Sequence, residues 1–280
     1  MKVYVTFDME GTSGTAFRAQ MSPDPSIPGA YQRALRFATD EVKAAIDGIL
    51  EVDPKAEIFF NDSHAASMNI FFEELPENTK IVVGSAETMD EVLGLDNSFD
   101  AFICVGAHAN ETTADAVLCH VWGVRELTFD KKPLTETDLD AALAGYYNVP
   151  LVAISGDEAT VRAIQENMPK VAAAVVKKGL GMYSAISLHP KKAQKLIKEA
   201  VIDGLKRRKE IPPVTYKNPI TVEIDYRDPF RAYANCVFMR DDQRVSATRI
   251  RYVASDAKDA YFGFLTRIRV SNTHFNRFLR

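Results

Sequence analysis

The sequence predicts an α/β fold: a mostly parallel sheet with helices on both faces, followed by a smaller α+β domain at the C-terminus. Short and almost entirely apolar strand segments alternate with helical segments through the first part of the chain, as in parallel sheets that are covered on both faces. Polar residues follow the ends of these segments. Beyond residue 185, strand segments follow one another without helices between them.

The first region, residues 1–185, is expected to form the parallel sheet. In the segment 31–50, apolar residues recur at helical spacing, for example at Val42, Ile46 and Ile49. A second helix is expected at 158–168 with Asp157 as its N-cap, because an aspartate at this position accepts hydrogen bonds from free N–H groups of the first turn. The predicted strands are 2–7, 57–60, 80–83, 101–105 and 150–155.

The second region, residues 186–280, is expected to be the smaller α+β domain. It opens with an amphipathic, basic helix at 189–209, which Pro212 and Pro213 end. Alternating apolar and polar residues then predict strands, and a helix is expected at 256–270. The predicted strands of this region are 220–226, 233–239 and 247–254.

Composition excludes several classes of protein. The 280 residues are 46% hydrophobic and 26% charged, which is ordinary for a globular protein. The 34 basic and 38 acidic residues give a net charge of −4, so we expect no nucleic-acid partner. The longest apolar runs are shorter than the 18 or so residues of a membrane span, so no membrane partner is expected either.

The cysteines and the N-terminus indicate the compartment. Cys104, Cys119 and Cys236 have no paired spacing and form no disulfide framework, which favours a reducing environment. Asp8 interrupts the first apolar stretch too early for a signal peptide. We therefore expect a cytoplasmic protein.

Two carboxylates end the first predicted strand. Asp8 follows the segment 2–7 and Glu10 comes two residues later, so in an extended chain both side chains leave the same face. Carboxylates held this close repel each other unless a proton or a cation lies between them. Taken singly, either acid would also suit a helix cap or a turn at the strand end.

Two histidines occupy the same position after other strands. His64 follows the segment 57–60 and His108 follows 101–105, although the chain has only five histidines. A lone histidine there could be an ordinary loop or packed residue, but ligands gather at the carboxyl ends of parallel strands. With Asp8 and Glu10, these imidazoles form a mixed oxygen and nitrogen set that suits zinc, manganese, iron or cobalt better than magnesium or calcium. A bridging carboxylate would support a two-metal centre.

Several segments together resemble the zinc D-aminopeptidase family. They are, in order, FDMEG at 7–11, NDSH at 61–64, GAHA at 106–109, GVRELTFDKKPLTE at 123–136 and AGYYNVP at 144–150. The resemblance extends over most of the chain and is densest in residues 1–160. It implies a di-zinc peptidase with a parallel α/β domain and a smaller second domain, assembled as pentameric rings stacked into a decamer.

The resemblance also implies the metal ligands. It makes Asp8 the bridging ligand, places Glu10 and His108 with it on one zinc ion, and places His64 and Glu136 with it on the other. Manganese or cobalt would suit the same ligands. Without the resemblance, Glu136 would be interpreted as an acid at the start of a helix.

The resemblance further implies a catalytic histidine, matched here by His120 in VLCHVWGV. The segment between His120 and Gly123 is shorter than the family pattern leads us to expect, and a partly buried loop histidine is the alternative. Cys119 is a candidate nucleophile beside it. Adjacent residues of a strand point to opposite faces, however, so Cys119 and His120 would not hydrogen-bond to each other.

The expected function is metal-dependent aminopeptidase hydrolysis of short peptides or aminoacyl amides. The resemblance implies a preference for D-amino acids, although no residue in the sequence selects D over L. One alternative is another two-metal hydrolase that acts on an amide or phosphoester of a small metabolite; the absence of a glycine-rich phosphate loop in the sequence argues against phosphate. The other alternative is a metal-binding or assembly protein without activity.

Overall fold

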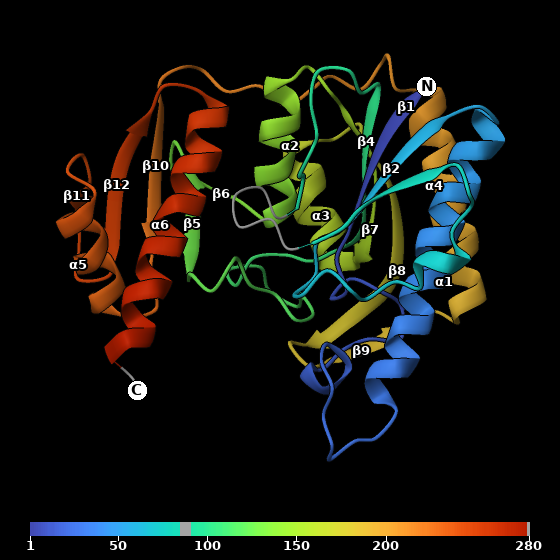
Figure 1. Cartoon of the computed structure of the whole chain (residues 1–280), viewed down its shortest axis with the longest axis horizontal. Helices are drawn as coiled ribbons and strands as arrows, with labels where there is room; N and C mark the ends of the chain where they lie inside the picture. The colour runs from blue at the N-terminus through green and yellow to red at the C-terminus, as the bar shows by residue number, and fades with distance from the viewer. Residues whose placement is uncertain (85–90, 279–280) are drawn as a thin grey trace.

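The larger sheet confirms the predicted α/β architecture. The computed structural model describes residues 1–84 and 91–278, and the side chains up to residue 272. Its larger sheet has seven strands in the order β3-β2-β1-β4-β7-β8-β9, and only β9 pairs antiparallel with its neighbour (Figure 1). The strands are β1 (Lys2–Phe7), β2 (Glu57–Asp62), β3 (Thr79–Val82), β4 (Ala101–Ala107), β7 (Leu151–Asp157), β8 (Ala172–Gly181) and β9 (Ser184–Ser187).

Helices cover both faces of this sheet. On one face, α1 (Ala30–Val52) packs against α4 (Pro190–Lys206), and α4 packs on β7 and β8. On the other face lie α2 (Glu136–Tyr146) and α3 (Glu158–Asn167). Asp157 caps α3 as expected, because its carboxylate accepts hydrogen bonds from the N–H groups of Ala159 and Thr160, both at 3.0 Å.

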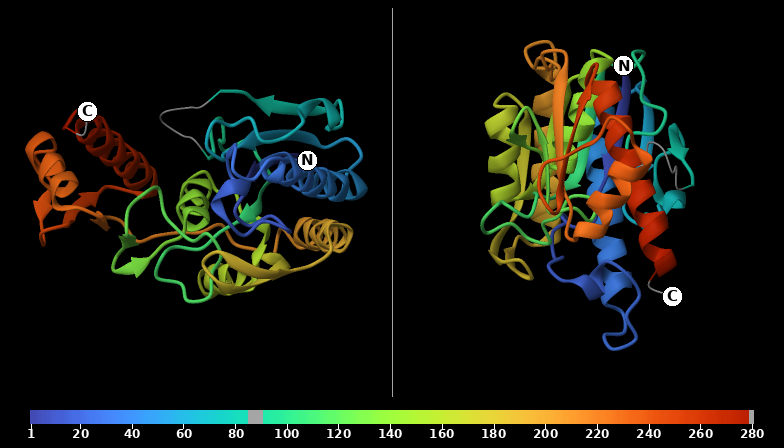
Figure 2. Two further views of the ribbon diagram at one scale, coloured as in Figure 1. Left: turned by 90° about the horizontal axis from the view of Figure 1, so that it is seen from below. Right: turned by 90° about the vertical axis from the view of Figure 1, so that its left-hand side faces the viewer.

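A second, antiparallel sheet lies beside the first (Figures 1 and 2). Its five strands have the order β11-β12-β10-β5-β6, and α2 contacts both β4 of the large sheet and α6, which packs on β10 and β12. The elements of this part are β5 (Glu126–Phe129), β6 (Lys132–Pro133), β10 (Ile220–Asp225), α5 (Pro229–Phe238), β11 (Gln243–Arg244), β12 (Arg249–Ala254) and α6 (Ala257–Phe278).

One predicted strand of this region is wrong. Residues 233–238 lie in helix α5 and Met239 is its C-cap, so the segment forms no strand. The helix begins with Asp228, whose side chain accepts a hydrogen bond from the N–H of Arg231, and with Pro229 in its first turn. Both are helix-start signals, and they outweigh the β-type residues Tyr233 and Val237 that suggested a strand.

The division of the chain at residue 185 stays a prediction. The structure shows that elements from both sides of it contribute to both sheets. Helix α4, which follows residue 185, packs on the large sheet, whereas β5 and β6, which precede it, pair within the small one. In addition, one hydrophobic core runs from Phe102 of β4 through Leu143 of α2 to Ile224 of β10 and Phe264 of α6.

Two short 3-10 helices, η1 (Arg18–Gln20) and η2 (Phe72–Glu74), complete the described elements. In residues 1–84 and 91–278, every helix falls short of the length or the apolar character needed to cross a bilayer.

The strand register brings the polar segments to one edge of the large sheet. Phe7, at the end of β1, pairs with Asp62 of β2 on one side and with Val105 of β4 on the other. The loops after these strands then meet, and the N–H of Gly11 donates to the carbonyl of Gly106 at 2.8 Å. A Cβ on Gly11 would lie 2.2 Å from the carbonyl oxygen of Ala107, so glycine at position 11 permits this contact.

Candidate metal centre

The predicted ligands meet at this edge of the sheet. The Nδ1 atom of His64 lies 3.1 Å from Oδ1 of Asp8 and 3.0 Å from Oε2 of Glu10. The Nε2 atom of His108 lies 3.0 Å from Oδ2 of Asp8 and 3.1 Å from Oε2 of Glu136. The carboxylate of Asp8 therefore faces both imidazoles, one with each oxygen, which is the arrangement expected of a bridging ligand.

Buried polar groups hold the loop that carries Glu10. The ammonium group of Lys177, on β8, donates hydrogen bonds to the backbone carbonyls of Glu10, Thr12 and Thr15. From α1, Oε1 of Glu41 accepts a hydrogen bond from the N–H of Ser13 at 2.9 Å. Lys177 and Glu41 are fully buried or nearly so. The loop after β1 is therefore anchored to the protein interior by side chains that are distant in the sequence.

A second polar network fixes His64. The carboxylate of Asp62, at the end of β2, accepts hydrogen bonds from the N–H of His64 at 3.3 Å and from the N–H of Asn69 at 2.5 Å. The side chain of Asn69 in turn donates to the carbonyl of His64 at 2.7 Å. Asp62 thus holds the two ends of the loop from His64 to Asn69 together through hydrogen bonds. This contact explains the aspartate in the NDSH segment.

Each imidazole of the site has one nitrogen directed at a backbone carbonyl. Nε2 of His64 lies 3.2 Å from the carbonyl oxygen of Met21, Nδ1 of His108 lies 3.0 Å from that of Ala109, and Nδ1 of His120 lies 2.8 Å from that of Leu118. A carbonyl only accepts, so these nitrogens carry the proton. The opposite nitrogens of His64 and His108 then face the carboxylates, which is how metal-ligating histidines are oriented.

The carboxylates dominate the electrostatics of the site. Burial alone would lower the pKa of His64, but Glu10 and Asp8 outweigh it and raise the pKa to about 11. Glu136 and Asp8 likewise hold the pKa of His108 well above its usual value. Both rings therefore take up a proton when no other cation is present, and a metal ion would replace those protons. The donor set and its charge fit a divalent metal.

The geometry agrees with part of the expected division of ligands between two ions. Among the described residues, Asp8, Glu10 and His108 offer ligand atoms within 4.8 Å of one another, as one zinc site would require. A second such group consists of His108, His120 and Glu136, whereas the resemblance combined Glu136 with Asp8 and His64. The assignment of individual ligands to two ions stays a prediction.

Glu136 both starts a helix and faces His108, while its role as a metal ligand stays a prediction. It is the first residue of α2, after the N-cap Thr135. Its Oε1 atom accepts a hydrogen bond from the N–H of Trp122 at 2.6 Å, and its Oε2 atom faces His108. The backbone of the shortened segment after His120 thus orients one oxygen of Glu136 and leaves the other directed at the centre.

Sequence reasoning missed two ionisable residues at or beside the site. Glu91 is buried and lines the cavity of about 290 Å³ above the centre, together with Asp8, His64 and Trp122. Burial and the neighbouring Asp140 and Glu136 raise the pKa of Glu91 well above its usual value. Nothing in the sequence near Glu91 indicated this. Lys177 had a signal, because it is a lysine that directly follows the all-apolar first half of β8.

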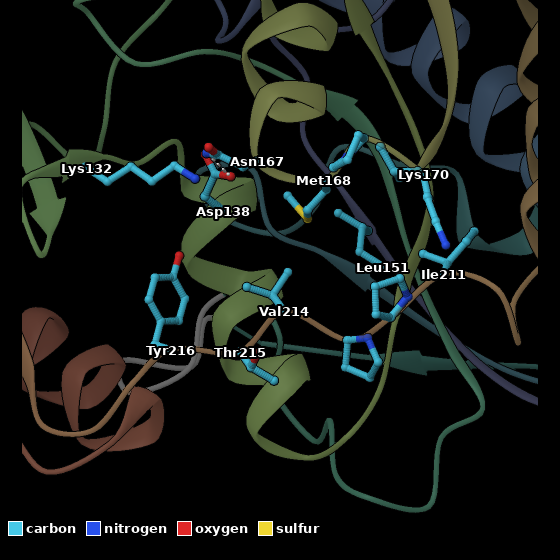
Figure 3. Close-up of a pocket in the computed structure, with 14 residues that line it drawn as sticks. Lys132, Asp138, Leu151, Asn167, Met168, Lys170, Ile211, Val214, Thr215 and Tyr216 are labelled. Carbon is cyan, nitrogen blue, oxygen red and sulfur yellow. Dashed lines mark hydrogen bonds between the residues drawn. The ribbon is translucent and has the colours of Figure 1, made fainter.

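Another cavity of the molecule lies apart from the centre. It has a volume of about 320 Å³ and lies beside α2, between the segment 211–216 and the end of α3. Figure 3 shows Asn167 hydrogen-bonded to Asp138 at one end of it and the apolar side chains of Leu151, Met168 and Val214 in its middle. None of the predicted ligands lines this cavity.

Comparison with known proteins decides the family. Residues 1–266 match the model of the Peptidase_M55 family, described as D-aminopeptidase. The chain belongs to this family. It is 27% identical over 271 residues to a D-aminopeptidase of Bacillus subtilis (strain 168), with 95% of this chain and 96% of the relative covered.

A solved structure of the family has the same fold. It is the Zn-dependent D-aminopeptidase DppA from Bacillus subtilis, a self-compartmentalizing protease, with a TM-score of 0.88, 27% identity and coverage of 97% of this chain and 98% of that one. The family that the motifs indicated is therefore confirmed, and so is the predicted α/β fold class. The roles of individual site residues stay predictions.

Proposed function

We propose that this member of the D-aminopeptidase family is a zinc-dependent enzyme that hydrolyses short peptides or aminoacyl amides with a free N-terminal D-amino acid. The observation that carries the proposal is the orientation of His64 and His108. Each ring donates from one nitrogen to a backbone carbonyl and directs the other at a carboxylate oxygen of Asp8. This arrangement prepares buried ligands on both sides of one bridging group.

Two zinc ions per chain are proposed, with manganese or cobalt as possible substitutes. Asp8 would bridge them, and Glu10, His64, His108 and Glu136 would complete the set. Zinc at such a centre lowers the pKa of an attacking water and polarises the scissile carbonyl. The bridging of two ions by one carboxylate fits Asp8 because its two oxygens face different imidazoles.

His120 is proposed as the group that moves the proton. Its Nδ1 proton is donated to the carbonyl of Leu118, so Nε2 of the neutral ring has a free electron pair. A base placed beside the centre takes a proton from the attacking water and returns it to the leaving amine, which contributes about 10²–10⁴-fold to such reactions. His120 lines the cavity above the centre, where the substrate must lie.

The function is tested with purified protein loaded in turn with zinc, manganese and cobalt. D- and L-alanyl dipeptides, the matching aminoacyl amides and a phosphoester are the substrates. We expect cleavage of the D-alanyl compounds that a chelator abolishes and zinc restores. Cleavage of the phosphoester alone would instead support a different two-metal hydrolase, and binding of zinc without any hydrolysis would support a non-enzymatic role.

We further propose that the chain assembles into a ring-shaped homo-oligomer, namely pentameric rings stacked into a decamer. The relative of known structure is a self-compartmentalizing protease. In this chain, Leu180, Tyr183 and Ile186 of the β8–β9 hairpin expose large apolar side chains at the edge of the large sheet. Clustered exposed apolar groups of this kind mark interaction surfaces. Light scattering at micromolar concentration tests this, and a monomeric mass would refute it.

A further inference from the structure

A second cavity adjoins the candidate centre and differs from it in charge. It has a volume of about 480 Å³ and shares Glu10 and His120 with the cavity above the metal ligands. Arg18, Arg227 and Arg231 form the basic part of its wall. The cavity over the ligands has the acid Glu91 and no arginine or lysine among its lining residues. A molecule that lies across His120 therefore meets basic groups on one side only.

The three arginines come from distant parts of the chain. Arg18 begins η1, in the loop that follows the metal ligands Asp8 and Glu10. Arg227 follows β10, and Arg231 lies in the first turns of α5. Packing of the small sheet beside the large one thus brings two guanidinium groups to the cavity of a site built by the other sheet.

These arginines are only partly neutralised. Arg227 forms an ion pair with Glu111, and Nε of Arg231 lies 3.1 Å from Oδ2 of Asp228. Arg18 is exposed and, in the described parts of the chain, forms no ion pair. A guanidinium presents several N–H donors, so the single ion pair with Glu111 does not exhaust Arg227. Arg18 and Arg227 therefore offer positive charge and donors to an anion.

The chemistry of an aminopeptidase decides which part of a substrate reaches this wall. The N-terminal residue carries an ammonium group, which the arginines repel. The residue beyond the scissile bond leaves with a free amine, and its other end carries a carboxylate in a dipeptide. With the scissile bond at His120 and Glu10, only the leaving residue can extend towards the arginines, which bind carboxylates through paired hydrogen bonds.

We propose that Arg18 and Arg227 bind a carboxylate of the leaving amino acid and thereby make the enzyme selective for substrates that carry one close to the scissile bond. The inference rests on the proposed function. The carboxylate has two possible sources: the C-terminal carboxylate of a dipeptide, or the acidic side chain of a residue in the leaving position. Aminoacyl amides, which have no carboxylate, are then poor substrates.

Three compounds that share an N-terminal D-alanine separate these cases. They are D-alanyl-D-alanine, its C-terminal amide, and the C-terminal amide of D-alanyl-D-glutamate. We expect kcat/KM of the first to exceed that of its amide roughly 10- to 100-fold, the range for loss of a charge-assisted contact. Recovery of the rate with the glutamate amide would assign the site to an acidic side chain as well; a low rate would assign it to the C-terminal carboxylate.

Variants connect the selectivity to the arginines. Arg18→Ala and Arg227→Ala should lower kcat/KM for D-alanyl-D-alanine roughly 10-fold or more and leave the amide unchanged. Glu111→Gln should raise kcat/KM for the dipeptide, because it frees Arg227. Arg36→Ala is the matched control: its side chain is 46% exposed and ion-paired with Glu74, much as that of Arg227 is 48% exposed and paired with Glu111. Equal rates for dipeptide and amide, or equal losses for both, would overturn the inference.

A binding measurement separates failure of this inference from failure of the proposed function. Reduced-bond analogues, in which a methylene replaces the scissile carbonyl, are titrated calorimetrically as acid and as amide. Tighter binding of the acid than of the amide, lost in Arg18→Ala and Arg227→Ala, supports the carboxylate site even if no compound is hydrolysed. Absence of hydrolysis together with such binding would overturn the proposed function alone. Equal binding of acid and amide overturns the inference whatever the activity.

Discussion

The imidazole ring of His120 is stacked on that of His108, with centroids 4.2 Å apart and planes within 6° of parallel. The carbonyl of Ala109 fixes the pair, since it accepts hydrogen bonds from Nδ1 of His108 at 3.0 Å and from the N–H of His120 at 2.9 Å. His108 faces the carboxylates while His120 covers it towards the cavity. The buried His108 and the partly buried His120 therefore have different positions relative to a substrate.

Replacement of His120 by alanine should lower kcat by about 10²–10³-fold while the zinc content stays unchanged. The reason is that the predicted ligand set remains intact and only the proton-transferring group is lost. KM should change much less, as expected for an interaction made mainly in the transition state. Steady-state kinetics on variants of known metal content measure this.

Two outcomes would reverse that assignment. Loss of zinc from His120→Ala would make His120 a ligand, as its proximity to His108 and Glu136 permits. Full activity would remove it from the mechanism. Cys119→Ser is the control: the thiol is buried next to His120, burial raises its pKa, and the variant should keep its activity.

Replacement of Asp8 by alanine should be the most damaging change to metal binding. Its two oxygens face His64 and His108, so we expect the zinc content to fall from about two ions per chain to below one. Elemental analysis after zinc loading and desalting measures it. Asp24→Ala, which removes an exposed carboxylate outside the centre, should keep the full content. Retention of both ions by Asp8→Ala would disprove the bridge.

Replacement of Lys177 by methionine should destabilise the protein by about 3 kcal/mol and weaken zinc binding. The change leaves the buried carbonyls of Glu10, Thr12 and Thr15 without their donor, at about 1–3 kcal/mol for each unsatisfied group. Chemical denaturation and zinc titration measure the two effects. The neighbour Lys178 has an exposed side chain paired with Glu158, so Lys178→Met should cost at most about 1 kcal/mol. Similar losses in both variants would contradict the role of Lys177.

The carboxyl group of Glu41 should make stability depend on pH. Burial raises its pKa from 4.5 to about 7. Between pH 4.5 and pH 7, Glu41 holds a proton in the folded chain but releases it in the unfolded chain. The stability that this bound proton gives the folded state is therefore complete below pH 4.5 and is lost as the pH rises through 7. Glutamine at this position retains the acceptor for Ser13 without the charge.

We therefore expect Glu41→Gln to match the original protein at about pH 5 and to exceed its free energy of unfolding by about 2–3 kcal/mol at about pH 8.5. Urea unfolding at both pH values measures the difference. Glu51→Gln, at an exposed position of the same helix, should change stability by less than about 0.5 kcal/mol at either pH. A constant difference between Glu41→Gln and the original protein would contradict the shifted pKa.

The large sheet was predictable because its signals are local. Strands β1, β2, β4 and β7 of that sheet are short apolar runs that end in or before polar residues, and parallel pairing brings those residues to one edge. Asp8, His64 and His108 were found in this way. Glu136 required the resemblance to the family, because an acid in the first turn of a helix is ordinary.

The remaining features depend on contacts between distant segments. Helix α5 was interpreted as a strand because Tyr233 and Val237 favour strands, while Asp228 and Pro229 decide the structure. The arginines at the second cavity come together only when η1 and α5 are packed in place. Neither Arg18 nor Arg227 has a sequence neighbour that indicates its role.

The contact between Lys177 and the carbonyl of Glu10 spans 167 residues. During synthesis, Asp8 and Glu10 leave the ribosome first, yet the donor that shapes their loop appears only when β8 has been made. A nascent chain that ends before β8 thus carries the candidate ligand side chains without the contact that holds the loop of Glu10 in place. The loop that carries Glu10 therefore reaches its final shape only after β8 has joined the sheet.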